Sequence, residues 1–398
     1  MLERKRKLDC ANGREKADLV LKNGNVLNVF TEEVLKADVA ICGDTIVGVG
    51  EYEGKEIDCT GKYLVPGFID AHMHIESCMA APGELAKVLA KAGTTTIIAD
   101  PHEIVNVSGT KGMDYFLKCA AKLLVNVFFM VPSAVPATDV ETNGCGEFLA
   151  SDMMKYVDNA RVLGLGETMR FMECCEGEKR MADKLELFAK KHIDGHAPGI
   201  RGKEVQAYRL AGVENDHECS TAEEVLDKLR AGLHIYVREG SGAKNLETLI
   251  KTMLDAGVCL DRCAFCTDDK HVEEIRKEGH ISTCIRKAIA LGVPVAKAYK
   301  MGSYQAAEFY GLKNYGAIGA GYRADIVFLD DLEQVRPLDV MKDGRILTEE
   351  DYAKDYSVPV PDELLHTVHV GEVTKEKIRL SCDGKTDVIQ MNPHQIVT

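Results

Sequence analysis

An apolar, strand-like run ends in two histidines at Val65-Pro66-Gly67-Phe68-Ile69-Asp70-Ala71-His72-Met73-His74. The histidines are two residues apart, and alternate residues of a strand lie on the same face. Both imidazoles could therefore bind one metal ion. A His-x-His pair alone is weak support, because such pairs are ordinary on protein surfaces, so the rest of the chain has to decide.

Seven further apolar runs follow, and six of them end in an acidic residue or a histidine. These six end at Asp100, Glu167, His196, His217, Glu239 and Asp268, and the seventh, Asn126 to Ser133, ends in a serine. From His72 to Asp268 the runs recur on average every 28 residues. That is the length of a strand, a helix and two turns.

Helical patterns lie between these runs. One helix is predicted from Pro82, with Leu85 and Leu89 on its apolar face, and ends before Gly93. Another begins at a capping box, Ser220-Thr221-Ala222-Glu223, and ends near Gly232. Eight strand–helix units predict an α/β fold, a (β/α)8 barrel, whose active site lies at the carboxyl ends of the strands. The acidic residues and histidines stand at those ends.

Both flanks of the predicted barrel look like short β-strands. The predicted strands are Leu19–Leu21, Val39–Ile41, Ile46–Val49, Ala324–Leu329 and Val340–Arg345, with turns at Gly24-Asn25 and Gly43-Asp44. We expect both flanks to form one small β-sandwich domain. The predicted division is residues 1–64 and 313–347 for this domain, 65–312 for the barrel, and 348–398 for a linker and the start of a C-terminal domain.

Composition favours a small-molecule enzyme. A chain of 398 residues with 45% hydrophobic content can bury a large core plus a smaller domain. The net charge of −14 argues against a nucleic-acid or anionic-membrane partner, which would favour clustered positive charge.

The N-terminus lacks a secretory signal and no segment reaches membrane-spanning length, so we expect a cytoplasmic protein. The 14 cysteines are expected to be reduced thiols, and Cys263-Ala264-Phe265-Cys266 lacks the second pair of a zinc motif.

Several motifs carry a family resemblance. They are residues 66–74, Gly319–Asp325, His74-Ile75-Glu76-Ser77, Asp100-Pro101-His102-Glu103-Ile104, Gly164–Glu167, Asp194–Gly199, Asp216-His217-Glu218, Arg238-Glu239-Gly240-Ser241 and Cys266-Thr267-Asp268-Asp269. From about Ala17 to Leu347 the chain resembles the amidohydrolase superfamily and, within it, the bacterial and archaeal adenine deaminases. The resemblance implies hydrolysis of adenine to hypoxanthine and ammonia, a step of purine salvage, with adenine and water as substrates.

The resemblance also implies a metal centre. The implied ligands are His72, His74, Glu167, His196, His217 and Asp268, and the strand ends contain the same six. Imidazole and carboxylate ligands suit Mn(II) or Fe(II), with Zn(II) as an alternative. Many relatives bridge two metals with a carbamylated lysine, and here Glu167 holds that place. We therefore expect two ions bridged by a carboxylate and a hydroxide, with a single ion as the alternative.

The implied mechanism needs hydroxide and two proton transfers. Metal binding lowers the pKa of water from about 15.7 to about 7, and the resulting hydroxide would attack C6 of adenine. Asp268 would take the proton and pass it to the departing ammonia. For protonation of N1 the candidates are Glu239, His217 and Glu218, and Glu239 is favoured because an apolar run ends there. The alternative for Glu239 is a salt bridge with Arg238 or a neighbouring helix.

Further residues are candidates for substrate contact or for orienting the ligands. They are His102, Glu103, Glu76, Ser77, Ser241 and Asp269. A purely local turn role is the alternative for His102 and Glu103. Four other histidines are expected on the surface or in packing, namely His192, His234, His271 and His280.

Other functions remain open beside the deaminase. Nucleobase deaminases of the other architecture need a Pro-Cys-x-x-Cys motif, which this chain lacks. An amidohydrolase acting on a related heterocycle or a cyclic amide would use the same barrel, and a non-catalytic scaffold would bind little metal. The resemblance implies a homo-oligomer, with a dimer favoured. It also implies a longer C-terminal domain, whose opening strands we expect from Glu376–Leu380 to Ile396–Thr398.

Overall fold

Eight parallel strands form the larger part of the molecule. The computed structural model describes residues 2–141, 143–381, 384–386, 388–393 and 395. The strands are β6 (Phe68–Met73), β7 (Thr94–Ala99), β8 (Asn126–Val131), β9 (Val162–Thr168), β10 (His192–Gly195), β11 (Asn215–Asp216), β12 (His234–Arg238) and β13 (Cys263–Cys266). They pair as a five-stranded sheet, β10-β9-β8-β7-β6, and a three-stranded sheet, β11-β12-β13. The predicted α/β fold with eight parallel strands is confirmed.

The two sheets meet at two seams. At the first seam, between β13 and β6, the amide of Asp268 donates to His72 O at 3.0 Å and the amide of His74 donates to Asp268 O at 3.1 Å. At the second seam, between β10 and β11, the amide of Glu214 donates to Ile193 O at 3.0 Å. These contacts close the eight strands into a ring of the TIM-barrel type.

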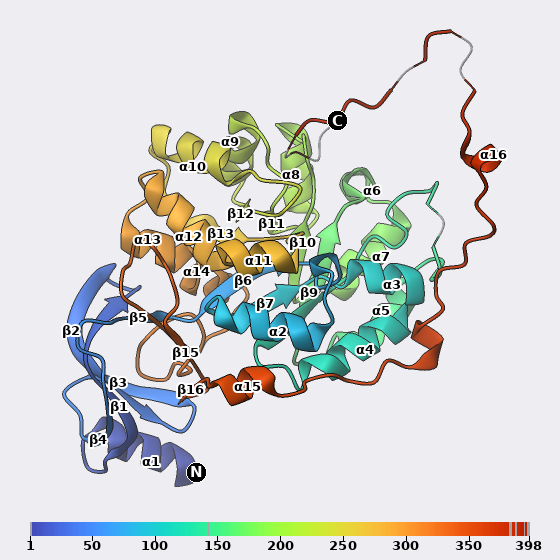
Figure 1. Ribbon diagram of the computed structural model, residues 1–398. Coiled ribbons are helices and arrows are strands. Elements are labelled where there is room, and N and C mark those ends of the chain that lie inside the picture. Colours follow the sequence, from blue (N-terminus) through green and yellow to red (C-terminus); the bar gives the residue numbers. More distant parts are fainter. Residues whose placement is uncertain (1, 142, 382–383, 387, 394, 396–398) are drawn as a thin grey trace.

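Helices surround this ring, as Figure 1 shows. They are α2 (Pro82–Lys91), α3 (His102–Ser108), α4 (Thr110–Ala120), α5 (Ala150–Met153), α6 (Phe171–Glu176), α7 (Lys179–Leu187), α8 (Lys203–Leu210), α9 (Ala222–Arg230), α10 (Leu246–Asp255), α11 (Val272–Glu278), α12 (Ile281–Ala290), α13 (Val295–Met301) and α14 (Tyr304–Phe309). Helix α2 begins at Pro82 and buries Leu85 and Leu89, as predicted. The capping box of α9 is one residue later than predicted, because Thr221 Oγ1 accepts from the Glu224 amide and Glu224 Oε2 accepts from the Thr221 amide.

The smaller part is a mixed β-sheet built from both flanks of the barrel. Its strands are β1 (Ala17–Asn28), β2 (Glu33–Cys42), β3 (Thr45–Gly50), β4 (Gly54–Asp58), β5 (Tyr63–Pro66), β14 (Ile326–Leu329), β15 (Asp339–Lys342) and β16 (Arg345–Ile346), preceded by α1 (Leu2–Ala11). The order is β16-β15-β14-β5-β1-β2-β3, with β4 beside β1, so the flanks join where β5 pairs with β14. The strands form a single hydrogen-bonded sheet, and the sandwich arrangement stays a prediction.

One predicted turn in this sheet is wrong. Gly24-Asn25 does not reverse the chain, because β1 continues through it with a register shift between Leu21 and Gly24. Asn23 has φ 61°, a left-handed conformation that asparagine tolerates better than most residues. The turn-forming residues therefore produce a β-bulge inside a long strand.

The C-terminal segment first runs along the outside of the barrel helices and then extends away from them (Figure 1, red). It contains α15 (Glu349–Ala353) and α16 (Lys375–Ile378). Between them, Tyr115 Oη of α4 donates to Val358 O at 3.1 Å, and Lys111 pairs with Glu363 at 2.7 Å. The strands predicted from residue 376 onward are wrong for the described residues, which form α16 and irregular chain, whereas residues 396–398 lie outside the described residues. No helix in the described part of the chain is long and apolar enough to span a membrane.

Candidate metal centre

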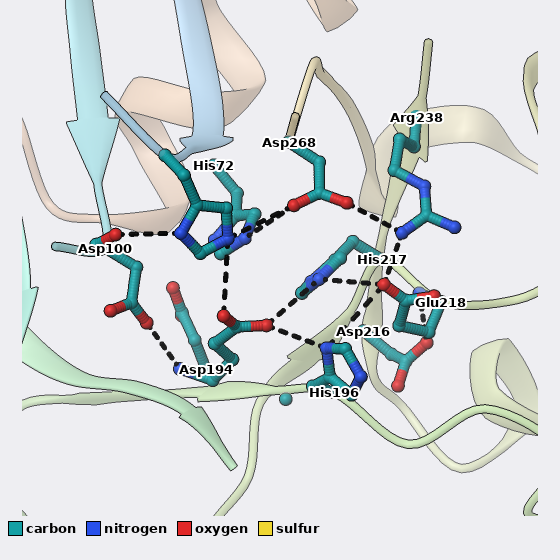
Figure 2. A network of polar contacts seen from close by, with 12 residues as sticks. His72, Asp100, Asp194, His196, Asp216, His217, Glu218, Arg238 and Asp268 are labelled. Carbon is teal, nitrogen blue, oxygen red and sulfur yellow. Dashed lines mark hydrogen bonds and ion pairs between the residues drawn. The ribbon is translucent and has the colours of Figure 1, made fainter. Parts of the chain in front are cut away.

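The six predicted ligands converge at the carboxyl ends of the barrel strands. Figure 2 shows His72, His196, His217 and Asp268 around one centre. They come from both sheets, since His72, His74, Glu167 and His196 lie on or directly after strands β6, β9 and β10, and His217 and Asp268 follow β11 and β13. All are buried except His196, which is partly exposed. The sequence positions alone predicted this convergence, because carboxyl ends of parallel strands share one face of a barrel.

Glu167 stands between two groups of histidines. Its Oε1 lies 3.3 Å from His74 Nε2, and its Oε2 lies 2.7 Å from His196 Nδ1 and 3.5 Å from His217 Nε2. Three sets of ligand atoms, each within 4.8 Å, overlap here: His72–His74–Glu167, His72–His217–Asp268 and Glu167–His196–His217. One carboxylate thus faces two adjoining clusters of nitrogen donors.

Asp268 Oδ1 approaches the two histidines at the carboxyl end of β6. It is 3.2 Å from His74 Nε2 and 3.5 Å from His72 Nε2. The backbone of Asp268 has φ 57°, which residues other than glycine rarely adopt. Such strain persists where the surroundings fix the residue, often at functional sites. Here the first seam fixes it, through its hydrogen bonds to His72 and His74.

The donor set fits a divalent cation. Both ring nitrogens of His72 and of His217 are buried without a hydrogen-bond partner. Buried polar side-chain atoms are rarely left without a partner in folded proteins, so these imidazoles are arranged for one that the protein itself does not supply. The two rings stack with their centroids 4.1 Å apart. Imidazole and carboxylate groups without a thiolate suit manganese, iron or zinc.

Electrostatics keep the two carboxylates ionised. Burial opposes ionisation of Glu167, but His74 and His196 hold its pKa well below the usual value. Burial likewise opposes ionisation of Asp268, but the adjacent imidazoles of His72 and His74 hold its pKa well below the usual value. Burial lowers the pKa of His72, which favours its neutral form, the form that binds metals.

Buried acceptors behind the ligands hold them in place. His74 Nδ1 donates to Asp100 O at 2.9 Å, and the Glu167 amide donates to Asp100 Oδ2 at 2.9 Å. The close approach of Asp100 needs glycine at Gly166, where a Cβ atom would overlap Asp100 Oδ2. The run that ends in Asp100 was recognised from the sequence, but this supporting role was not. Such contacts fix the tautomer and direction of a ligand.

A second buried group lies behind His72. Asp70 Oδ1 accepts from the His72 amide at 3.1 Å, and Asp70 Oδ2 accepts from Thr267 Oγ1 at 2.6 Å. His280, expected in packing, is fully buried, with its Nε2 3.1 Å from Asp70 Oδ2 and its Nδ1 2.9 Å from Thr94 Oγ1. It therefore joins α12 to the strands that carry His72 and Asp268.

Glu239 does not reach the cluster, although it was the favoured proton donor to N1. Its Oε1 lies 2.6 Å from Lys287 Nζ on α12. Tyr236 and Arg238 face the barrel interior, so strand alternation places Glu239 on the outer side. The salt bridge with a neighbouring helix, which was the alternative, is what the structure contains.

Glu218 and Arg238 lie at the cluster instead. Glu218 Oε1 is 3.3 Å from His217 Nε2 and 3.6 Å from His196 Nδ1. Arg238 Nη1 donates to Glu218 Oε1 and, at 2.8 Å, to Asp268 Oδ2 (Figure 2). Arg238 is only 3% exposed. Arg238 was not among the residues predicted for the site, although it lies two residues after Tyr236 and therefore on the same face of β12.

Two predicted substrate-contact residues, Glu103 and Asp269, lie beside His74, and a third, His102, precedes Glu103 at the start of α3. Glu103 Oε2 is 3.4 Å from His74 Nδ1, and His74, Glu103 and Asp269 form a fourth set of donor atoms within 4.8 Å. His102 is buried, and its Nδ1 has no hydrogen-bond partner. Glu103 and Asp269 thus border the cluster beside His74.

The three remaining candidates make local or loop contacts, and the first of them, Ser77, donates from Oγ to His74 O at 3.0 Å. Glu76 Oε1 accepts from the Ile104 amide at 3.0 Å, and burial together with Glu103 raises its pKa to about 8. Ser241 Oγ accepts from the His271 amide and donates to Glu274, both at 2.9 Å. Ser241 thus joins the loops after β12 and β13.

Comparison with known proteins places this centre in a family context. The amidohydrolase family model matches residues 63–347. An adenine deaminase of Desulfitobacterium hafniense (strain Y51) is 46% identical over 388 residues, which are 97% of this chain and 68% of that protein. An adenine deaminase of Clostridium acetobutylicum is 45% identical and covers 96% of this chain and 67% of its own length. The chain therefore spans about two thirds of these relatives.

Solved structures share the fold at low identity. A crystal structure of an adenine deaminase superposes with a TM-score of 0.61 at 18% identity, and covers 83% of this chain and 100% of that chain. A β-aspartyl dipeptidase of Fervidobacterium islandicum AW-1 gives a TM-score of 0.59, also at 18% identity, over 85% of this chain and 98% of that chain. At these identities the likeness concerns the fold alone.

Proposed function

The chain belongs to the amidohydrolase family, and we propose that it converts adenine and water to hypoxanthine and ammonia. The observation that carries the reaction type is Glu167 between two groups of buried histidines, which suits a metal-dependent hydrolase. The substrate follows from relatives named adenine deaminase that are 45–46% identical over almost the whole chain. We also propose that the mixed sheet beside the barrel forms the expected β-sandwich domain.

Six side chains would hold the metal. They are His72, His74, Glu167, His196, His217 and Asp268. We propose two divalent ions, manganese or iron, with zinc as an alternative, because one carboxylate faces both ligand clusters. When bound, such ions lower the pKa of water to about 7, so that hydroxide is available at neutral pH.

Asp268 would move the first proton. Water supplies two protons in this reaction: one ends on the departing amino group, which leaves as ammonia, and the other ends on N1 of hypoxanthine. The pKa of Asp268 is held well below its usual value against the effect of burial, by His72 and His74, so it starts as an anion that can accept a proton. It would pass this proton to the amino group as the C6–N bond breaks.

Glu218, rather than Glu239, would deliver the second proton to N1. Burial opposes its ionisation, but His217, His196 and Arg238 lower its pKa, so it too starts as an anion that can take a proton from water. Arg238 contacts both Glu218 and Asp268 and would hold the two carriers at a fixed separation. His102, Glu103 and Asp269 border the same space and are the proposed contacts to the purine.

The test is ammonia release from adenine by protein reconstituted with Mn(II), followed by the change in absorbance from adenine to hypoxanthine. Asp268→Asn keeps the size of the side chain and is expected to lower kcat by about 100-fold or more, because a general acid/base contributes about 10²–10⁴. Metal content is measured for both proteins. Metal-loaded wild-type protein that releases no ammonia would contradict the proposal.

The alternatives predict other outcomes of the same experiment. A cyclic amide hydrolase would open hydantoin or dihydrouracil without releasing ammonia, and a scaffold protein would purify with little metal. We further propose that the enzyme is a cytoplasmic homo-oligomer, with a dimer favoured. Light scattering measures the oligomeric state directly.

A further inference from the structure

Lys228 of α9 is a buried cation that takes no part in the proposed chemistry. Its side chain and that of Asp216 are both 0% exposed. Lys228 Nζ lies 3.0 Å from Asp216 Oδ1 and donates to Ala197 O at 2.7 Å. A lysine is rarely buried so completely without a specific partner, so this contact needs a reason.

Asp216 holds the backbone on both sides of the second seam. Its Oδ2 accepts from the Ala197 amide at 2.9 Å, and its Oδ1 accepts from the Glu218 amide at 2.8 Å. Ala197 directly follows His196, and Glu218 directly follows His217. Lys228 binds the Ala197 carbonyl as well. The Lys228–Asp216 ion pair therefore fixes the amide and the carbonyl of Ala197 and the amide of Glu218.

Backbone pairing contributes little at the second seam, where the Asn215 side chain also helps, because its Oδ1 accepts from the Gly195 amide at 3.0 Å. Strand β11 is only two residues long, and β10 and β11 belong to different sheets. Strand pairing therefore does not set the distance between their carboxyl ends, and side chains have to do so; among them, the Lys228–Asp216 pair holds the residues that directly follow His196 and His217. Lys228 is itself anchored on a helix that begins with a full capping box.

We propose that Lys228 and Asp216 form a positioning pair, which sets the separation of His196 and His217 so that both can bind metal. The inference rests on the proposed metal centre but not on the identity of the substrate. Neither residue touches the substrate or the reacting atoms. They act through the backbone that follows the two histidines.

The test compares two buried ion pairs. Lys228→Met removes the cation at the seam and keeps the length of the side chain. Lys342→Met is the matched control, because Lys342 forms a buried pair with Asp325 at 3.1 Å in the β-sheet domain. Metal affinity is measured by competition with a chromophoric chelator, and the visible spectrum of Co(II)-loaded protein reports the ligand geometry. Thermal unfolding of the metal-free proteins gives their stability.

We expect both variants to unfold at lower temperature, and only Lys228→Met to bind metal about 10- to 100-fold more weakly, with an altered Co(II) spectrum. The double variant Asp216→Asn/Lys228→Met removes both charges, so its stability should recover towards that of the wild type while its metal affinity stays low. If Lys228→Met does not fold, this double variant carries the test. The inference is overturned if metal affinity recovers together with stability, or if both lysine variants bind metal like the wild type. These measurements need no adenine turnover, so failure of the proposed reaction would leave them interpretable.

Discussion

Arg238 and Glu239 are neighbours at the end of β12, and their side chains point to opposite faces of the strand. Arg238 reaches Glu218 and Asp268 inside the barrel, whereas Glu239 pairs with Lys287 of α12. Alternation along a strand guarantees that only one of the two can face the centre. It does not say which one, because the orientation of a strand in the barrel is set by its packing with other strands.

Glu218→Gln and Glu239→Gln should therefore differ sharply. The first variant removes the proposed proton carrier and should lower kcat by about 10²–10⁴ at unchanged metal content. The second leaves kcat near the wild-type value and lowers stability by about 1 kcal/mol or less, because Lys287 is 43% exposed and its ion pair is screened by water. Steady-state kinetics with adenine decide between them, and a larger loss of kcat in the Glu239 variant would refute the assignment.

Lys184 offers a pH-dependent prediction away from the metal ligands. It is 3% exposed, its Nζ donates to Ser133 O at 2.6 Å, and burial lowers its pKa to about 8. In the unfolded chain a lysine titrates near 10.4. Between these two values the unfolded state binds the additional proton, so this residue makes stability rise with pH through that window.

The free energy of unfolding of the wild type, minus that of Lys184→Met, should therefore increase from pH 8 to about pH 10. Below pH 8 the difference should be constant, because the lysine is charged in both states. Urea unfolding of the metal-free proteins at several pH values measures it. A difference that stays flat across the window would show that Lys184 keeps its charge when buried.

Most individual site residues could be predicted, and the exceptions share a cause. The six ligands stand at the ends of apolar runs, and a barrel brings such ends together whatever the details of packing. The roles of Asp100, Asp216 and Arg238 depend on which backbone amide or carboxylate lies opposite, and that is decided by contacts between strands distant in sequence. No local pattern contains this information.

The N-terminal cap of α9, which the sequence predicts, should affect the metal centre because the helix carries Lys228. Thr221→Ala removes the cap of α9 and should lower the free energy of unfolding by about 1 kcal/mol. Because α9 carries Lys228, this variant should also weaken metal binding slightly. Thr348→Ala is the control, since it removes the hydrogen bond from Thr348 Oγ1 to Asp351 at the start of α15, a helix without buried residues. Urea unfolding and chelator competition measure both effects, and an equal loss of metal affinity in the two variants would contradict the link.

Local patterns predicted the existence of elements better than their details. The apolar face of α2 and the capping box of α9 were recognised, the latter displaced by one residue because Glu224 rather than Glu223 completes it. Gly24 was read as a turn, but β1 continues because its partner β2 pairs with it on both sides of the bulge. Turn residues signal an irregular backbone, and tertiary pairing decides whether the chain reverses.

For the whole protein, metal removal should loosen the barrel where its two sheets meet. The five-stranded sheet contributes His72, His74, Glu167 and His196, and the three-stranded part contributes His217 and Asp268. Because the metal would bind only the folded state, it would stabilise that state by about 2.7 kcal/mol when the free metal concentration is 100 times Kd. Chelation should lower Tm and speed hydrogen exchange at the amides of His74, Asp268 and Glu214, while β1 to β3 stay protected. Uniform exchange throughout the barrel would contradict this picture.

The overall architecture was predictable because eight repeats of one length admit few folds. The repeats set the strand order and the face on which the ligands gather. They did not reveal that the ring consists of two sheets, because that follows from the brevity of β11 and the geometry at Asp268. The path of the C-terminal segment along α4 was equally hidden, since it depends on single contacts such as Tyr115 with Val358.

The two barrel sheets are also formed by two successive parts of the polypeptide, β6 to β10 and then β11 to β13. Among the described residues, the chain passes from one barrel sheet to the other between β10 and β11. A cut at Gly212 would leave two fragments, each with its own barrel strands and its own share of the ligands. The fragments would still share the β5–β14 pairing and both seams. Because each fragment contributes ligands to the same centre, a divalent cation should strengthen the association of the two fragments.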